Sequence, residues 1–222
     1  GGGNIASVTG DATINITKAT LNDVFGGGNK GAISGSTYVS VLDNAKITNL
    51  YAGSNQANVG NNTNVDITNG IITNLYGGNN LTGNISGNLN STINGGIITN
   101  LFGGGNQADT TSNTYVTVNE GTLTNLYGGG KEALVNSSNI LINNTTNIDN
   151  LFGGGYVGNV TGDTSIEINE GTLTYVYSGG YSGDILGNTN LIVNNGTFKD
   201  IYGGGYAGDV LQDTNIIVNG GT

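Results

Sequence analysis

The sequence contains no cysteine, proline, methionine, tryptophan or histidine, and its five basic residues are all lysine. Without histidine or arginine, the chain lacks the most common general base and the side chain best suited to clamp an acidic sugar. Without cysteine it needs no oxidising compartment, and its composition says nothing about one. The absence of proline, with glycine that does not recur at every third position, excludes a collagen triple helix.

Positive charge and long apolar runs are also scarce. Five lysines stand against fifteen acidic residues, which gives a net charge of −10. This charge opposes binding to nucleic acid or anionic lipid, because both depend on basic side chains that neutralise phosphate. No apolar run approaches the 18 residues of a membrane span, and no signal-peptide pattern is present. We therefore expect no membrane span in this segment and expect any export signal or anchor to lie outside it.

Glycine and β-forming residues dominate what is present. Glycine accounts for 42 of the 222 residues, and 35% of the chain is hydrophobic. That apolar fraction is too large for a disordered polar tract, and it is rich in the β-branched and aromatic residues that fit a pleated surface. The apolar side chains must therefore be buried in a β-structure.

The strongest signal is an internal repeat of 25 or 26 residues. An aliphatic residue, an aromatic residue and a glycine-rich triplet recur eight times, at spacings of 26, 25, 26, 25, 25, 25 and 25 residues. The units begin near residues 24, 50, 75, 101, 126, 151, 176 and 201. This period predicts about nine coils in one continuous array over residues 1–222.

One unit, residues 151–175, shows the internal pattern most clearly. Ile166 and Ile168 alternate with Ser165 and Glu167, which is the period of a strand with one buried face. A second apolar site follows an Asn-x-Gly turn, where glycine and asparagine tolerate positive φ. A third apolar site precedes the main strand, so the pattern predicts a triangular coil with three apolar sites.

These features predict an all-β fold, a single-stranded parallel β-helix (β-solenoid) with strands about 4.8 Å apart and a length of about 43 Å. Both ends lack capping repeats, so we expect the stack to continue in a longer chain or to associate end to end. A recurring threonine shares the parity of the buried aliphatic residues and is expected to face inward, at Thr37, Thr63, Thr114, Thr164, Thr189 and Thr214.

The repeat resembles a known group of proteins. The string at 126–130 (Leu-Tyr-Gly-Gly-Gly), the segment from Gly158 to Thr164 and the Asn-x-Gly-Thr turn at 169–172 are similar to the glycine-rich adhesin-like repeats of very large bacterial surface proteins. This resemblance, which covers the whole chain, implies a right-handed parallel β-helix of the broad group that includes pectate lyases and autotransporter stalks. It also implies an exported location.

Two sets of aromatic residues are candidates for stacking or binding. The first set would stack along the rod as a structural ladder, either inside the coil or on its surface, and its mixture of phenylalanine and tyrosine favours packing: Phe25, Tyr51, Tyr76, Phe102, Tyr127, Phe152, Tyr177 and Tyr202. The second set, Tyr156, Tyr181 and Tyr206, follows the glycine triplet and is the better candidate for exposed contacts with a carbohydrate.

Two carboxylates are candidates for a calcium ion. Asp184 and Asp209 occupy the same position on neighbouring coils, and Ca²⁺ binds carboxylate and carbonyl oxygens. The equivalent positions Asn58 and Asn84 in earlier coils carry no charge, so a continuous column of ions is not expected. We predict no other cofactor.

Catalysis and ice binding find little support. The lysines lie in different coils and different slots, and no carboxylates cluster with a base. The outward positions of the main strand are irregular and partly charged, unlike the flat threonine array that orders water. We therefore predict that the chain is not an enzyme but a structural stalk or fibre-forming segment of an extracellular, cell-surface adhesin-like protein. Its possible partner is a surface polysaccharide or host glycan. The alternatives are a carbohydrate-binding module and a Ca²⁺-stabilised surface fibre.

Overall fold

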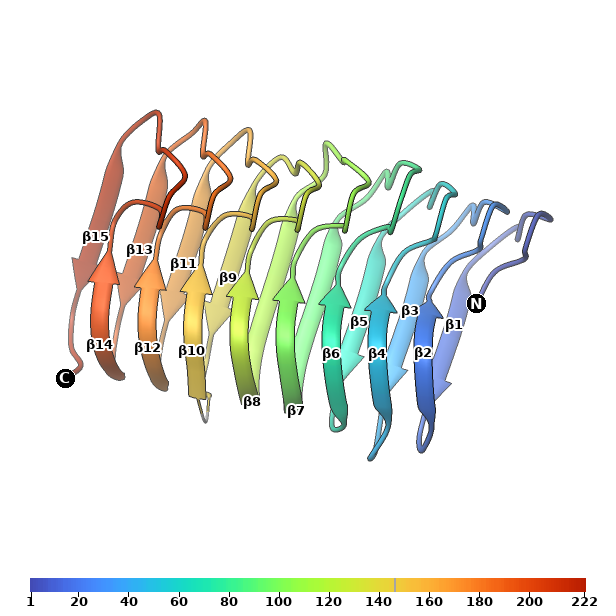
Figure 1. The fold of residues 1–222 in the computed structure, drawn as a ribbon, viewed down its shortest axis with the longest axis horizontal. Coiled ribbons are helices and arrows are strands. Elements are labelled where there is room, and N and C mark those ends of the chain that lie inside the picture. The colour runs from blue at the N-terminus through green and yellow to red at the C-terminus, as the bar shows by residue number, and fades with distance from the viewer. Residues whose placement is uncertain (146) are drawn as a thin grey trace.

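The computed structural model describes residues 1–145 and 147–222, and there it confirms an all-β parallel solenoid. Each coil contributes strand residues to two faces and returns through a glycine-rich loop (Figure 1). Each strand pairs in parallel with the strand on the same face of the next coil, without slippage between β1 and β3 or between β2 and β4. The stack makes about eight turns, close to the nine coils expected, with nine strands of the described chain on the first face and eight on the second.

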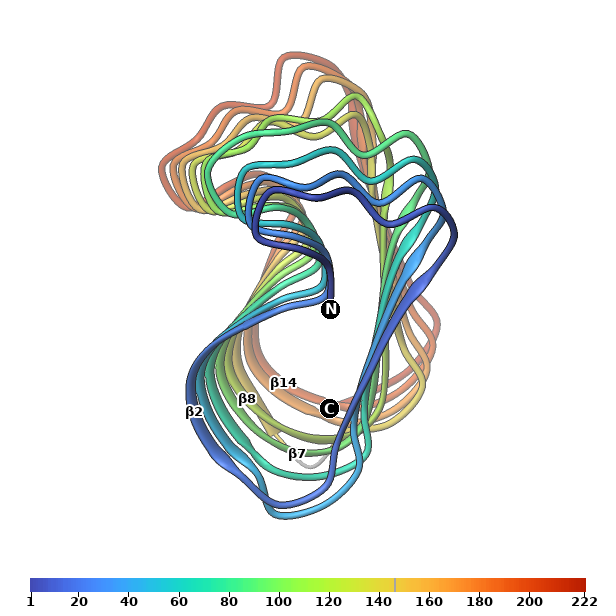
Figure 2. The ribbon, with the colours of Figure 1, turned by 90° about the vertical axis from the view of Figure 1, so that its right-hand side faces the viewer.

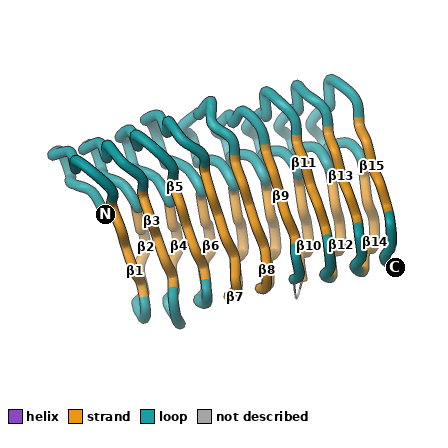
Figure 3. The backbone as a smooth tube through the Cα atoms, turned by 180° about the vertical axis from the view of Figure 1, so that it is seen from behind, coloured by secondary structure: helices purple, strands orange, loops and turns teal. Residues whose placement is uncertain are grey.

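The first face is seen from behind in Figure 3, with its strands side by side along the rod. In spatial order it contains β1 (Ala12–Ile16), β3 (Thr37–Val41), β5 (Thr63–Ile67), the first part of β7 (Leu89–Phe102), the first part of β8 (Thr114–Tyr127), β9 (Ser138–Ile142), β11 (Thr164–Ile168), β13 (Thr189–Val193) and β15 (Thr214–Val218). The second face contains β2 (Thr20–Phe25), β4 (Lys46–Tyr51), β6 (Ile71–Tyr76), the second parts of β7 and β8, β10 (Asn147–Phe152), β12 (Thr172–Tyr177) and β14 (Thr197–Tyr202).

The solenoid is right-handed. Seen from its N-terminal end, the chain runs clockwise as it recedes from the viewer (Figure 2). The outline has two lobes instead of the expected triangle: the two strand faces enclose the lower lobe, and the glycine-rich loops form the upper one. The outline is indented on one side, between the second face and these loops.

The main core lies between the two faces and follows the alternation predicted from the repeat. Ile166 and Ile168 are buried, whereas Ser165 and Glu167 between them are exposed. Burial of one such side chain contributes roughly 1.5 to 3 kcal/mol. Because the coil is a single layer of chain, the contacts come from coils above and below, so stability depends on stacking.

The inward-facing threonines join the two faces of a coil from within. Thr114 is fully buried and its hydroxyl donates to the carbonyl of Gly128, fourteen residues later, at 2.6 Å. The same bond recurs at distances of 2.5 to 2.8 Å from Thr37 to Ala52, Thr63 to Gly77, Thr164 to Ser178 and Thr189 to Gly203. The expected inward orientation is thus confirmed in these coils. Thr214, in the last strand, is exposed.

The third apolar site is one residue wide and forms isolated parallel bridges, such as Val59 to Ile85 and Val135 to Val160. Thr110 is buried between these two groups and its hydroxyl donates to the carbonyl of Ile85 at 3.4 Å. The small apolar clusters around the bridges are separate from the main core. A third site therefore exists, but it is not a strand face.

Glycine is required at the turns and where coils meet. Gly121 and Gly171 have φ values of 120° and 138°, in the Asn-x-Gly turns expected to need them. In the glycine triplet the reason is contact instead: a Cβ atom at Gly103 would lie 2.3 Å from the carbonyl oxygen of Gly128 in the next coil. The triplets let the upper loops pack backbone against backbone.

Candidate binding groove beside the aromatic ladder

The aromatic ladder is continuous but does not belong to the main core. Leu50 packs in that core, and Tyr51, which follows it in β4, belongs to a separate aromatic cluster. Neighbouring ring centroids lie 4.7 to 5.0 Å apart, with the ring planes within 9° of parallel, from Phe25 to Tyr202. The five central rings, from Tyr51 to Phe152, are only 3% to 6% exposed. The structure therefore places these residues as a buried structural stack beside the second face.

The predicted binding tyrosines form a second stack against this ladder. Tyr156 and Tyr181 have ring centroids 4.8 Å apart, and Tyr181 and Tyr206 are 5.0 Å apart. Each also meets a ladder ring edge to face, as Tyr181 does with Phe152 at 5.6 Å. Tyr181 is thus stacked on both faces, and Tyr206 alone of the three is strongly exposed, at 60%. This arrangement gives the three tyrosines a packing role, and their predicted role in carbohydrate binding stays a prediction.

Asparagine takes the place of these tyrosines in the earlier coils. Asn29, Asn55, Asn80 and Asn106 each donate a side-chain hydrogen bond to the asparagine one coil before, beginning with Asn4, at 2.6 to 2.9 Å. Lys131 occupies the next position, and the three tyrosines follow it. We call the coils with asparagine here the asparagine-walled coils and those with tyrosine the tyrosine-walled coils.

A second asparagine ladder runs on the other side of the aromatic stack. Asn49 donates to the carboxylate of Asp23, and each later member donates to the preceding amide, all at 2.9 Å, through Asn74, Asn100, Asn125 and Asn150. Sequence reasoning identified stacked asparagine in the turns but missed these two columns. The available signal was the asparagine that precedes the aliphatic–aromatic pair in five successive units.

Between the walls lies a groove of about 380 Å³, where the asparagine-walled coils meet the tyrosine-walled coils. Its lining consists of Asn74, Tyr76, Asn100, Phe102, Asn125, Tyr127, Lys131 and Tyr156. Burial raises the pKa of Tyr127 to about 12, with a smaller contribution from the nearby Tyr156, and also raises the pKa of Tyr76. These phenols are therefore neutral at physiological pH and can donate hydrogen bonds.

The charge in this groove is balanced. The Lys131 ammonium lies 3.5 Å from the carboxylate of Glu132, and both side chains are partly exposed. The groove therefore offers amides, phenol hydroxyls and one ion pair, which suit the binding of a small polar molecule. The described part of the chain contains no cluster of three or more acidic, histidine or cysteine residues of the kind that holds a metal ion.

The proposed calcium ligands have another role in the structure. One oxygen of Asp184 accepts the backbone N–H of Asp209 at 3.0 Å, and the N–H of Asp184 is bonded by Asn159 at 2.9 Å. Asp163 similarly accepts the N–H of Asn188 at 2.7 Å. Carboxylates and amides in this loop thus hold the next coil, and Ca²⁺ binding at Asp184 and Asp209 stays a prediction.

Comparison with known proteins gives no relative: no protein family, no curated protein and no solved structure matches this chain. Among the described residues there is also no helix with the length and hydropathy needed to cross a membrane. Function must therefore be argued from the geometry of the solenoid and its surface.

Proposed function

We propose that the chain is a structural rod segment, the stalk or fibre body of an exported, adhesin-like surface protein. The observation that carries this proposal is that the positions that recur best connect one coil to the next. Backbone pairing, the aromatic ladder and the asparagine ladders all act along the rod axis. Residues conserved between coils are thus used for elongation, whereas outward positions vary.

Such a design suits a mechanical spacer. In a solenoid each coil contacts its neighbours, so stability grows with the number of interfaces and length can change by whole coils. The side-chain ladders add to this, because a buried polar network is most stable when each member has a partner. A rod of this kind would hold another domain or a surface away from its anchor.

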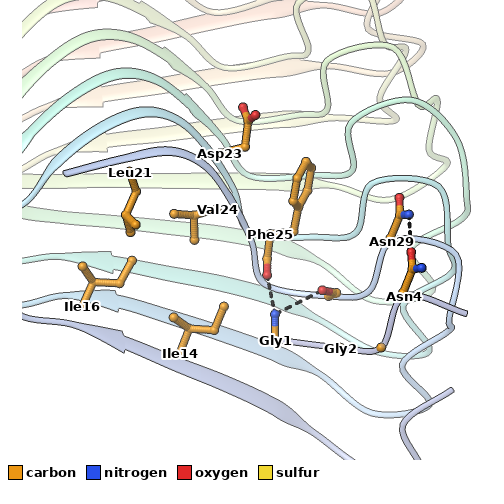
Figure 4. A pocket seen from close by; sticks show the side chains of 12 residues that line it. Gly1, Gly2, Asn4, Ile14, Ile16, Leu21, Asp23, Val24, Phe25 and Asn29 are labelled. Carbon is orange, nitrogen blue, oxygen red and sulfur yellow. Dashed lines mark hydrogen bonds between the residues drawn. The ribbon is translucent and has the colours of Figure 1, made fainter. Parts of the chain in front are cut away.

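Both ends of the described stack are shaped to receive another coil. At the N-terminal end, a hollow of about 470 Å³ opens onto core residues that include Ile14, Leu21 and Val24 (Figure 4). At the other end, Ile216 and Val218 of β15 are 39% and 60% exposed. An unpaired strand edge with apolar neighbours is a template for parallel pairing. We propose that the next coil comes from the same polypeptide or from a second copy.

Length provides the test of the rod proposal. A fusion of two copies joined without a linker, from Thr222 to Gly1, should appear in negative-stain electron microscopy as one thin rod about twice as long as a single copy. Two separate particles or a compact globule would contradict the proposal. Sedimentation of the single copy at several concentrations would show whether copies also associate without a covalent link.

The exported location needs its own experiment. An antibody against the folded rod should label intact source cells, and protease added outside those cells should remove the label. Label that appears only after lysis would overturn the surface location while leaving the rod architecture intact.

A further inference from the structure

The outward side of the first face contains a polar furrow between two columns of side chains. The strand register places Tyr38, Asn64, Asn90 and Tyr115 in one column on four successive coils. The second column, two residues further along each strand, contains Ser40, Asp66, Thr92 and Thr117. A hollow of about 160 Å³ lies between the columns and is lined by Tyr38, Ser40, Asn64, Asp66, Asn90 and Thr92, with the buried Val39 and Val65 beneath.

The two tyrosines at the ends of this column differ from those of the ladder. Tyr38 and Tyr115 are 42% and 40% exposed. Their neighbours in the column are not aromatic: Thr13 and Asn64 flank Tyr38, and Asn90 and Asn139 flank Tyr115. Neither ring stacks with an aromatic residue of the described chain, so their surfaces are free for a ligand.

The polar floor between the tyrosines is already ordered. Asn90 donates to the amide oxygen of Asn64 at 3.0 Å, and Asn64 donates to the carbonyl of Thr37 at 3.0 Å. Each amide nitrogen keeps a second N–H for a ligand. Asp66 accepts a hydrogen bond from Asn94 through one oxygen at 2.8 Å, and its carboxylate has further acceptor capacity.

We propose that this furrow binds an extended, uncharged polysaccharide whose chain lies along the rod axis. Tyr38 and Tyr115 are three coils apart, or about 14 Å at the strand spacing of a β-sheet, so one saccharide chain can contact both. Their rings would cover the C–H faces of sugar rings, and Asn64, Asp66, Asn90 and Thr92 would bond the hydroxyl groups.

Charge favours this occupant over an anionic one. The only ionisable group among the residues that line the hollow, apart from the Tyr38 phenol, is the carboxylate of Asp66, and the whole chain carries a charge of −10. An acidic polymer would meet repulsion there. The site is separate from Tyr156, Tyr181 and Tyr206, and it does not depend on the rod serving as a stalk.

Affinity electrophoresis of the whole chain provides the test. The probes are hydroxyethyl cellulose, xyloglucan, galactomannan and arabinoxylan, with polygalacturonate as the anionic comparison. We expect at least one uncharged polymer to retard the chain and polygalacturonate to have no effect. Tyr38→Ala and Tyr115→Ala should each weaken the retardation about tenfold, as expected for the loss of one aromatic contact, and the double variant should abolish it.

Two further variants separate this site from the rest of the surface. Tyr38→Phe keeps the ring and should retain most of the binding, and Tyr206→Ala removes a more exposed tyrosine outside the furrow and should change nothing. Circular dichroism would establish that each variant is folded. Absence of binding to all four uncharged polymers would overturn the proposal. So would binding that survives the double variant, or a loss of self-association instead of saccharide binding, which would make the furrow a contact between rods.

Discussion

The asparagine-walled and tyrosine-walled coils share one aromatic ladder but cover it differently. In the first group, Asn80 lies in a hydrogen-bonded amide column. In the second group, Tyr181 at the equivalent position stacks on Tyr156 and Tyr206 and meets Phe152 edge to face. The backbone accepts both, because its own pairing continues unchanged. The comparison teaches that the wall is the adjustable part of the coil, whereas the ladder and the core are the constant part.

The largest expected difference comes from truncating the ladder in each region. Phe102→Ala and Phe152→Ala should each lower the free energy of unfolding by about 3 to 5 kcal/mol, because both rings are buried and stacked on two neighbours. Phe152→Ala should cost about 0.5 to 1.5 kcal/mol more, since that ring also contacts Tyr181. Urea denaturation measures both, and equal losses would show that the tyrosine wall adds nothing to the ladder.

Alkaline pH tests the ladder at the boundary between the two groups. Folding raises the pKa of Tyr127 from about 10 to about 12, mainly through burial. Ionisation therefore favours the unfolded chain: the contribution of Tyr127 to stability is complete below pH 10 and is lost as the pH rises toward 12. Denaturation midpoints between pH 8 and pH 11.5 should fall less steeply in Tyr127→Phe than in the parent chain. An unchanged slope would mean that the phenol is accessible to water.

The walls themselves can be compared by truncation. Tyr181→Ala should destabilise the rod by about 2 kcal/mol, because it removes two stacked contacts and one edge contact. Asn80→Ala should cost about 1 kcal/mol, the net value of the hydrogen bonds to Asn55 and from Asn106 after solvation. If the order were reversed in urea denaturation, the amide column would be the stronger wall.

The smallest effect should be a gain in stability at the junction. The side-chain oxygen of Asn106 is buried without a hydrogen-bond partner, and Lys131 occupies the next position of the column. Lys131→Asn would supply an amide donor and extend the ladder by one member, for a gain of about 0.5 to 1 kcal/mol. Lys131→Ala is the matched control, since it removes the same ammonium without supplying a donor. A gain in both variants would trace the effect to the loss of Lys131 instead.

The repeat period predicted most of the fold. Spacing of the aliphatic–aromatic pairs was sufficient to place the coils, and residue parity placed Ile166 and Thr114 in the interior. The turns of Gly121 and Gly171 followed from the Asn-x-Gly pattern. These features are local to one coil or repeat identically in the next, so they are visible in a single sequence.

The groove and the furrow could not be predicted in the same way. The groove depends on how the glycine-rich loop folds back toward the second face, which brings Tyr156 against Tyr127, twenty-nine residues away and in an earlier coil. Periodicity predicts which residues stack, but not which columns lie beside each other. The furrow likewise requires the register that aligns Tyr38 with Tyr115, together with the knowledge that no aromatic residue stacks between them.

Deletion of one whole coil, residues 151–175, tests the central claim most directly. Because Leu151 pairs with Val176 and Phe152 with Tyr177, removal of this segment should bring Tyr177 into the place of Phe152, against Tyr127. We predict a chain that remains folded, keeps its β-sheet circular dichroism and is shorter by about 4.8 Å in cryo-electron microscopy. A chain that unfolds, or one that retains its full length, would contradict the account of a rod built from interchangeable coils.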